Sequence, residues 1–183
     1  MALKKKNNTG TLWEANRELH KLISTADYQT TFKSEREYET YLAGHLQSQK
    51  TCFGGHKFIS QISDEEKVTS AYCFGKKHRP DMSIDTDGIA IELKYFKGSP
   101  DEIKKALGQS ILYRIQYGWT FLICVVGREL ADVYTDIATG KESNLEHICK
   151  TLAEDFKVYT YFVSQKKPQS GHKKCINFFP EQD

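Results

Sequence analysis

The chain has 183 residues, of which 39% are hydrophobic and 27% are charged, and its formal net charge is +2. This size and composition suit one globular domain with a substantial core, and so small a charge gives no bulk electrostatic argument for nucleic-acid binding. The longest apolar run, Phe121–Val126, is far too short to span a membrane, and no apolar stretch follows the basic N-terminus. We therefore expect a cytoplasmic (intracellular) protein without a membrane partner.

The five cysteines are an odd number at irregular spacing, without a Cys-x-x-Cys pair, which argues against a disulfide framework. Cys52 with His56 and Cys73 with His78 could in principle supply ligands to zinc. Their spacing does not match zinc fingers closely, and a free cysteine is often a small buried hydrophobe. We favour the latter interpretation.

Basic residues are grouped in four places, which suits phosphate contact. These groups are Lys4–Lys6, Lys76–Arg79, Lys166–Lys167 and His172–Lys174. For any single group, a solvated loop or tail is the simpler interpretation.

In chain order, residues 1–10 are predicted to be a flexible tail and residues 11–183 a single domain. Four helices are each predicted by a Ser or Thr followed three residues later by Glu, the capping-box pattern. The pairs are Thr11/Glu14, Ser34/Glu37, Ser99/Glu102 and Ser143/Glu146. Apolar stripes at helical spacing support three of these helices: Leu12, Ala15, Leu19 and Leu22; Tyr38, Leu42, His45 and Leu46; Leu145, Ile148, Leu152 and Phe156.

Strand-like segments lie between and after these helices. They are Phe58–Ile62, Val68–Phe74, Asp81–Asp85, Ile89–Phe96, Phe121–Val126, Val158–Val163 and Lys174–Phe179. The helix between Phe96 and Phe121 allows a crossover to a parallel neighbour. The predicted fold is α/β: a mixed central sheet flanked by helices on both faces.

The clearest pair of strands is joined by Asp87-Gly88, a strong signal for a two-residue hairpin turn. In that register Asp81 faces Lys94 and Ser83 faces Glu92. Because side chains alternate, one face is then apolar (Met82, Ile84, Ile89, Ile91 and Leu93), and the other carries Asp81, Ser83, Ala90, Glu92 and Lys94.

The polar face offers what phosphodiester hydrolysis requires. Two carboxylates are hard oxygen ligands for Mg²⁺ or Mn²⁺, which polarises the phosphorus centre and acidifies a bound water. A nearby lysine can orient that water or offset charge that develops on the phosphate. The alternative is a half-exposed hairpin with an Asp–Lys cross-strand ion pair, a common surface feature that contributes little.

Arg79-Pro80-Asp81, followed by Glu92-Leu93-Lys94, resembles the motif of the PD-(D/E)xK nucleases, which include restriction endonucleases, Holliday junction resolvases and recombination exonucleases. The resemblance covers a core of about residues 34–126. It implies a restriction endonuclease-like αβββαβ core, with Asp81, Glu92 and Lys94 catalytic and with Mg²⁺ or Mn²⁺ at Asp81 and Glu92.

Two further features agree with this family. Gln109 and Tyr113 are similar to the Gln-x-x-x-Tyr signature of a subset of its members, and they share a helical face that the family implies borders the site. Gly108 would let that helix approach another backbone closely. The alternative is a polar exposed face with a tyrosine that reaches toward solvent.

The family often completes its metal site with an acid from the helix before the meander. Here that residue is predicted to be Glu39, which sits beside the apolar stripe, while Glu37 is assigned to the helix cap and Glu35 is expected to matter little. A solvated helix acid is the alternative for Glu39.

The predicted function is a metal-dependent DNA nuclease of restriction, repair or recombination type, acting as a homodimer or in a larger nucleoprotein complex. Two alternatives share its fold: a nucleic-acid-binding module without activity, and a subunit that acts only within a complex. Retention of Asp81, Glu92 and Lys94 together speaks against the first.

Overall fold

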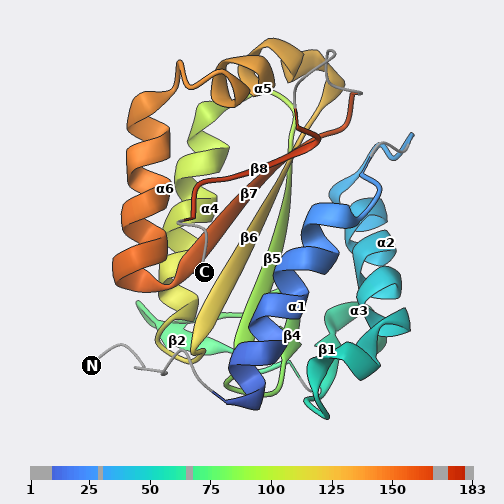
Figure 1. Cartoon of the computed structure of the whole chain (residues 1–183). Coiled ribbons are helices and arrows are strands. Elements are labelled where there is room, and N and C mark those ends of the chain that lie inside the picture. The colour runs from blue at the N-terminus through green and yellow to red at the C-terminus, as the bar shows by residue number, and fades with distance from the viewer. Residues whose placement is uncertain (1–9, 29–30, 65–67, 167–172, 180–183) are drawn as a thin grey trace.

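The computed structural model of the chain describes residues 10–28, 31–64, 68–166 and 173–179 (Figure 1). In these residues the helices are α1 (Thr11–Thr25), α2 (Glu35–Ser48), α3 (Gln61–Asp64), α4 (Pro100–Tyr113), α5 (Ala131–Ala138) and α6 (Ser143–Phe156), with 3₁₀ turns at Lys50–Phe53 and Arg128–Leu130. The strands are β1 (Phe58–Ser60), β2 (Ala71–Cys73), β3 (Lys76–His78), β4 (Met82–Ile84), β5 (Ile89–Phe96), β6 (Trp119–Val126), β7 (Val158–Ser164) and β8 (Cys175–Asn177). The tail predicted for residues 1–10 lies outside the described residues except for Gly10, as do Lys4–Lys6, Lys167 and His172 of the basic groups.

Six strands form one mixed sheet in the order β1-β4-β5-β6-β7-β8, and β2 pairs with β3 separately. Neighbours β5, β6 and β7 run parallel, whereas the outer pairs are antiparallel. Parallel neighbours require a crossover, which α4 supplies between β5 and β6, and which α5 and α6 supply between β6 and β7. This arrangement confirms the predicted mixed sheet flanked by helices.

The helices cover the sheet as two layers, with α1 and α2 on one face and α4, α5 and α6 on the other (Figure 1). Leu19 of α1 and Tyr38 of α2 are buried against Ile91 and Phe121 in the first core. All residues of β6 are buried, as expected for a central parallel strand with both faces covered. Residues of β5 and β6 pack against the helices on both faces, so these two strands form the centre of the fold.

The hairpin of β4 and β5 keeps its predicted faces but not its predicted turn. Met82 pairs with Ile91 and Ile84 with Ile89, so residues 85–88 form a four-residue connection. The predicted facings of Asp81 to Lys94 and of Ser83 to Glu92 are therefore wrong. The register differs by two residues, and a shift of two leaves every side chain on its predicted face.

Asp85 explains why the turn is longer than predicted. It adopts the left-handed conformation itself, with φ 57°, while its carboxylate accepts a hydrogen bond of 2.9 Å from the backbone amide of Lys57. Gly88 is required for a different reason than expected, because a Cβ there would lie 2.5 Å from the carbonyl oxygen of Ile84. The hydrogen bond between Asp85 and Lys57, the residue before β1, thus decides the turn in place of the local Asp-Gly signal.

The four predicted capping boxes have different outcomes. Ser34 and Glu37 form the reciprocal box that starts α2, which confirms that prediction. Ser99 caps α4, but its hydroxyl accepts from the amide of Asp101 and not of Glu102. The boxes predicted at Thr11 and Ser143 are wrong, since both residues lie inside their helices and neither helix has a side-chain cap.

Other segments differ from expectation mostly in extent. The strand predicted at Phe58–Ile62 ends at Ser60, where α3 begins, and the segment Val68–Phe74 contributes only β2. Strand β3 and helix α5 were not predicted, and Ile148, assigned to a core stripe, is 48% exposed. In the part of the chain that the structure describes, none of the helices has the length and apolarity that crossing a membrane requires.

One buried group in the first layer makes stability depend on pH. His20 of α1 lies among the rings of Phe121, Tyr159, Tyr161 and Phe179, and its Nδ1 is hydrogen-bonded to the hydroxyl of Tyr161. Desolvation by burial lowers the pKa of His20 from 6.5 to about 4. The folded state therefore resists a proton that the unfolded chain accepts.

We expect the free energy of unfolding to fall as the pH drops from about 6.5 to about 4, because protons bind preferentially to unfolded chains in this window. The contribution of His20 to this loss is about 3 kcal/mol. Urea denaturation of wild type and His20→Phe at several pH values measures it, since the difference between the two proteins isolates this residue. Parallel pH dependence in both proteins would contradict the assignment.

Candidate active site

The site is built where β5 passes between α2 and α4. Glu92 and Lys94 are on β5, and Asp81 comes immediately before β4. Helix α2 contributes Glu35 and Glu39, and α4 contributes Gln109 and Tyr113. The six residues predicted from the sequence thus come together in one region, joined by Glu35.

Lys94 is the positive centre of this site. Its Nζ lies 2.9 Å from Glu92 Oε1 and 2.9 Å from Glu35 Oε1. Burial alone would lower the pKa of Lys94, but the carboxylates of Glu92, Asp81 and Glu35 outweigh it and raise that pKa. Lys94 is therefore a fixed ammonium, paired along its own strand and with α2, and not the partner of Asp81 in an exposed hairpin.

Glu92 is the most deeply buried acid, with 1% of its surface exposed. Lys94 holds one of its oxygens, and the hydroxyl of Tyr113 donates a hydrogen bond of 2.8 Å to the other. Desolvation raises the pKa of Glu92, and the contacts with Lys94 and Tyr113 only partly oppose this. A carboxylate left in such surroundings costs free energy unless cationic charge compensates it.

Asp81 lies immediately before β4, where the pairing of β4 with β5 stops. Its Oδ2 accepts a hydrogen bond of 2.8 Å from the backbone amide of Leu93, on the edge of β5 that β4 has just left. Burial and the charge of Glu92 raise the pKa of Asp81 to about 7, against the opposing effects of Lys94 and of that hydrogen bond. Asp81 and Glu92 therefore repel one another across a short distance in a poorly hydrated place.

Glu39 belongs to the same electrostatic cluster. It is partly buried on α2, and burial followed by the charges of Asp81 and Glu35 raises its pKa to about 7. A helix acid in open solvent would show no such shift. The Glu39 carboxyl is therefore partly shielded from solvent and within electrostatic reach of Asp81.

Glu35 is the site residue that the sequence analysis missed. One of its oxygens pairs with Lys94, and the other accepts a hydrogen bond of 3.0 Å from the backbone amide of Tyr95. Glu35 thus contacts the site, although it was expected to matter little; its effect on activity stays untested. Its position four residues before Glu39 was the available signal, because residues four apart share a helical face.

Helix α4 closes the site from the other side. Gln109 donates a hydrogen bond of 2.7 Å to the hydroxyl of Tyr113, which in turn donates to Glu92. Tyr113 is fully buried, so it is not the solvent-directed tyrosine of an exposed polar face. The Gln-x-x-x-Tyr pair orients Glu92 through a chain of hydrogen bonds.

Gly108 does not serve the role that was predicted for it. It is exposed, and an added Cβ would meet nothing within 4 Å among the described residues. The close approach of α4 to the sheet is made instead by Ala106 and Ser110, both buried.

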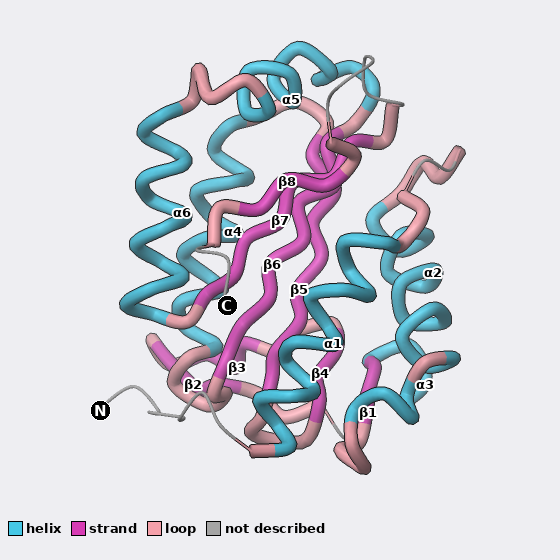
Figure 2. The backbone as a smooth tube through the Cα atoms, in the orientation of Figure 1, coloured by secondary structure: helices cyan, strands magenta, loops and turns pink. Residues whose placement is uncertain are grey.

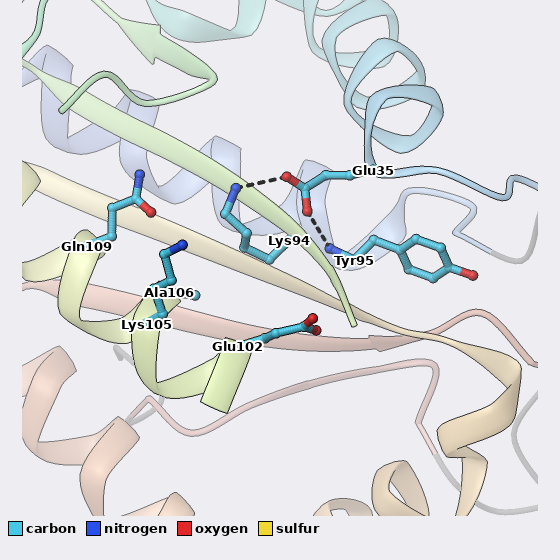
Figure 3. A pocket seen from close by; sticks show the side chains of 7 residues that line it. All are labelled: Glu35, Lys94, Tyr95, Glu102, Lys105, Ala106 and Gln109. Carbon is cyan, nitrogen blue, oxygen red and sulfur yellow. Dashed lines mark hydrogen bonds and ion pairs between the residues drawn. The ribbon is translucent and has the colours of Figure 1, made fainter. Parts of the chain in front are cut away.

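A pocket of about 320 Å³ opens beside this cluster. It is lined by Glu35, Lys94, Tyr95, Glu102, Lys105, Ala106 and Gln109 (Figure 3). Figure 3 shows Lys94 and Glu35 meeting on one side, with Gln109, Lys105 and Glu102 on α4 opposite. A ligand in this pocket would meet the Lys94 ammonium directly.

The donor set fits a hard divalent cation. Four carboxyl groups, those of Glu35, Glu39, Asp81 and Glu92, act electrostatically on one another or on Lys94, so the single ammonium cannot compensate all four when they are ionised. Mg²⁺ and Mn²⁺ prefer such oxygen ligands. Among the described residues, however, no group of three or more His, Cys, Asp or Glu is arranged so that it could hold a metal ion.

The cysteine and histidine pairs considered for zinc do not converge in the described residues. His56 is instead bonded through Nδ1 to Asp85 (2.6 Å) and through Nε2 to Thr11 (3.0 Å), which ties α1 to the hairpin turn. Cys52 and Cys73 are free thiols.

Comparison with protein-family models, with curated proteins and with solved structures found no match for this chain. The functional argument therefore depends on the geometry and charge of the site.

Asp81→Asn should raise the free energy of unfolding at pH 8 by up to about 4 kcal/mol, since a shift of roughly three pKa units is removed. The folded-state pKa of Asp81 lies above its unfolded value, so the ionised group destabilises the fold above about pH 7, whereas both states are protonated below about pH 4. The gain should therefore disappear toward pH 4. Asparagine keeps an oxygen for the Leu93 amide, so Asp81→Ala, which removes that acceptor, is the contrast. Chemical denaturation of the three proteins at pH 8 and pH 4 tests this, and an Asn variant less stable than wild type at pH 8 would refute it.

Proposed function

We propose that this chain is a metal-dependent nuclease that hydrolyses DNA phosphodiester bonds. The observation that carries the proposal is the buried cluster of Asp81, Glu92 and Lys94, with surplus negative charge, beside a pocket that a phosphate can enter. Structural ion pairs are normally balanced, whereas this cluster costs stability at neutral pH. Such costs are typical of functional sites.

Each residue has a role that follows from its position. Asp81 and Glu92, with Glu39, present oxygen ligands, and Tyr113 orients Glu92 through its hydroxyl. Lys94, held by Glu35, points its ammonium toward the pocket, where it would orient the attacking water or offset charge on the phosphate.

A divalent cation held by Asp81 and Glu92 would supply Lewis-acid charge and an acidified water. The ligands are hard oxygens, and the positive charge of such an ion would compensate the negative charge of the carboxylates. One Glu92 oxygen would have to exchange Lys94 for the ion, which a side chain with a flexible four-carbon stem allows.

The order of elements supports assignment to a restriction endonuclease-like core. Helix α2, strands β1, β4 and β5, helix α4 and strand β6 follow the order αβββαβ, and the site residues lie just before its second strand, on its third strand and on its two helices. Strands β2 and β3 form an insertion between the first two strands of this core. We propose membership of the PD-(D/E)xK superfamily on these grounds.

The substrate assay uses linear duplex, closed circular, single-stranded and branched DNA, each with EDTA, Mg²⁺ or Mn²⁺. Cutting that requires the metal supports the proposal, and cutting of a closed circle defines an endonuclease. DNA binding without cutting under every condition would favour the alternative, a binding module or a subunit that needs a homodimeric or nucleoprotein partner.

Mn²⁺ should bind to the wild-type protein in isothermal titration calorimetry. Binding should weaken at least tenfold in Asp81→Asn and in Glu92→Gln, because each substitution removes a charged ligand. Glu146→Gln, a change in a surface ion pair on α6, is the matched control and should bind like wild type. Undiminished binding in both site variants would remove the metal site from the proposal.

Lys94→Ala should reduce metal-dependent cleavage by two orders of magnitude or more, because the ammonium acts on charge that develops in the transition state. DNA affinity should fall only slightly, since one phosphate contact among many is lost. Lys150→Ala, which breaks an exposed pair with Glu146, is the control for a lost surface charge. A thermal melt establishes that each variant is folded. A folded Lys94→Ala that cuts at the wild-type rate would end the case for catalysis at this site.

A further inference from the structure

Strands β2 and β3 form a two-stranded ribbon outside the central sheet, at its lower end in Figure 2. Their register pairs Cys73 with Lys76, so Phe74 and Gly75 form the two-residue turn at its tip. Its base is buried at Ala71, whereas Tyr72, Lys76 and Lys77 are exposed.

The tip carries a residue that neither burial nor backbone preference explains. Phe74 is 84% exposed and has φ 52°, and Gly75 follows with φ 70°. Two successive positive φ values define a turn in which Asn or Asp normally precedes Gly. A bulky aromatic residue in this conformation is a genuine outlier, and such outliers persist mainly at functional sites.

A second aromatic ring and basic groups lie beside it. Tyr72 is 64% exposed, and it pairs across the ribbon with Lys77. Lys76 and Lys77 are exposed as well, and no acidic residue occurs between Tyr72 and Arg79. Exposed rings interleaved with lysines are the features with which proteins bind single-stranded nucleic acid: rings stack on bases, and lysines contact phosphates.

The base of the ribbon is fixed to the candidate active site. Ala71 is buried with Ala90 and Tyr113, and the carbonyl oxygen of Arg79 lies 3.1 Å from the Tyr113 hydroxyl that contacts Glu92. The chain from Phe74 to Asp81 spans seven residues, which extend at most about 23 Å. A DNA strand bound at the tip would therefore lie within about one helical turn of DNA, roughly 34 Å, from the site.

We propose that the β2–β3 ribbon is a DNA-binding element that stacks an unpaired base on Phe74 while Lys76 and Lys77 contact the backbone. The inference rests on the proposed nuclease function and adds a substrate class to it: DNA with exposed bases, as at single strands, forks or junctions. Charge complementarity and the two exposed rings favour DNA over an acidic protein or a second copy of the chain.

The test compares wild type with Phe74→Asn, which removes the ring and suits the turn better than phenylalanine, so the fold is preserved. Binding in EDTA is measured by fluorescence anisotropy for a single strand, a fork and a blunt duplex with capped ends. We expect Phe74→Asn to bind the single strand and the fork 5- to 100-fold more weakly, in line with the loss of about one stacked base, and the duplex nearly as wild type does. Phe74→Trp should retain binding.

Two further measurements separate stacking from charge. A single strand containing 2-aminopurine should be quenched by wild type and by Phe74→Trp, but not by Phe74→Asn. The pair Lys76→Gln and Lys77→Gln should weaken binding to all three DNAs and reduce the salt dependence by about two units of slope, whereas Lys141→Gln, in a surface pair with Asp136, should not.

The outcomes distinguish this inference from the proposed function. The ribbon proposal is overturned, and the nuclease proposal stands, if wild type binds or cuts DNA and Phe74→Asn either binds the single strand as wild type does or loses as much affinity for the duplex as for the single strand. Wild type that binds no DNA would overturn both. Loss of anionic-vesicle binding in Phe74→Asn, without loss of DNA binding, would identify a membrane-contact element instead.

Discussion

The balance of charge around Lys94 is the constraint on which the rest of the site depends. One ammonium is shared between Glu92 on its own strand and Glu35 on α2, so the ion pairs fix the position of a helix against the sheet as well as the charge at the centre. Glu92 in particular could not be buried as a carboxylate without the lysine, because an uncompensated charge in poor solvent costs several kcal/mol. The same lysine cannot neutralise Asp81 and Glu39 as well, and that shortfall is the reason for proposing that the cluster is a functional site and not merely a structural bridge.

Orientation of Glu92 extends this constraint into α4. The relay from Gln109 to Tyr113 to Glu92 consists of neutral donors, so it positions the carboxylate without cancelling its charge. A lysine or arginine in place of Tyr113 could donate the same hydrogen bond, but its positive charge would cancel the negative charge of Glu92. The choice of tyrosine is therefore consistent with a carboxylate that must stay available to a cation.

Features set by short-range chemistry could be predicted from the sequence. The bounds of β5, the cap of α2 and the two faces of the hairpin follow from alternation and capping, which act within a few residues. The register of the hairpin could not be predicted, because hydrogen bonds of the Asp85 amide and carboxylate with Lys57, the residue before β1, hold the turn from outside the hairpin. Glu35 was missed for the same reason: its role comes from contacts with Lys94 and Tyr95, about sixty residues away. The signature pair Gln109 and Tyr113 was identified because its four-residue spacing is itself local.

The short length of β4 has a consequence for the behaviour of the protein in concentrated solution. Beyond Ile91, which pairs with Met82, β5 has β6 on one side but, among the described residues, no strand on the other, and its amides at Leu93 and Tyr95 point toward that open edge. Asp81 and Glu35 fill that edge, each accepting one amide hydrogen as a neighbouring strand would. Their negative charges also repel any β-strand that approaches from another molecule. Whatever their part in the proposed chemistry, these two acids thereby protect an open strand edge against intermolecular sheet growth, so replacing them with apolar residues exposes a template for aggregation as well as abolishing the charge.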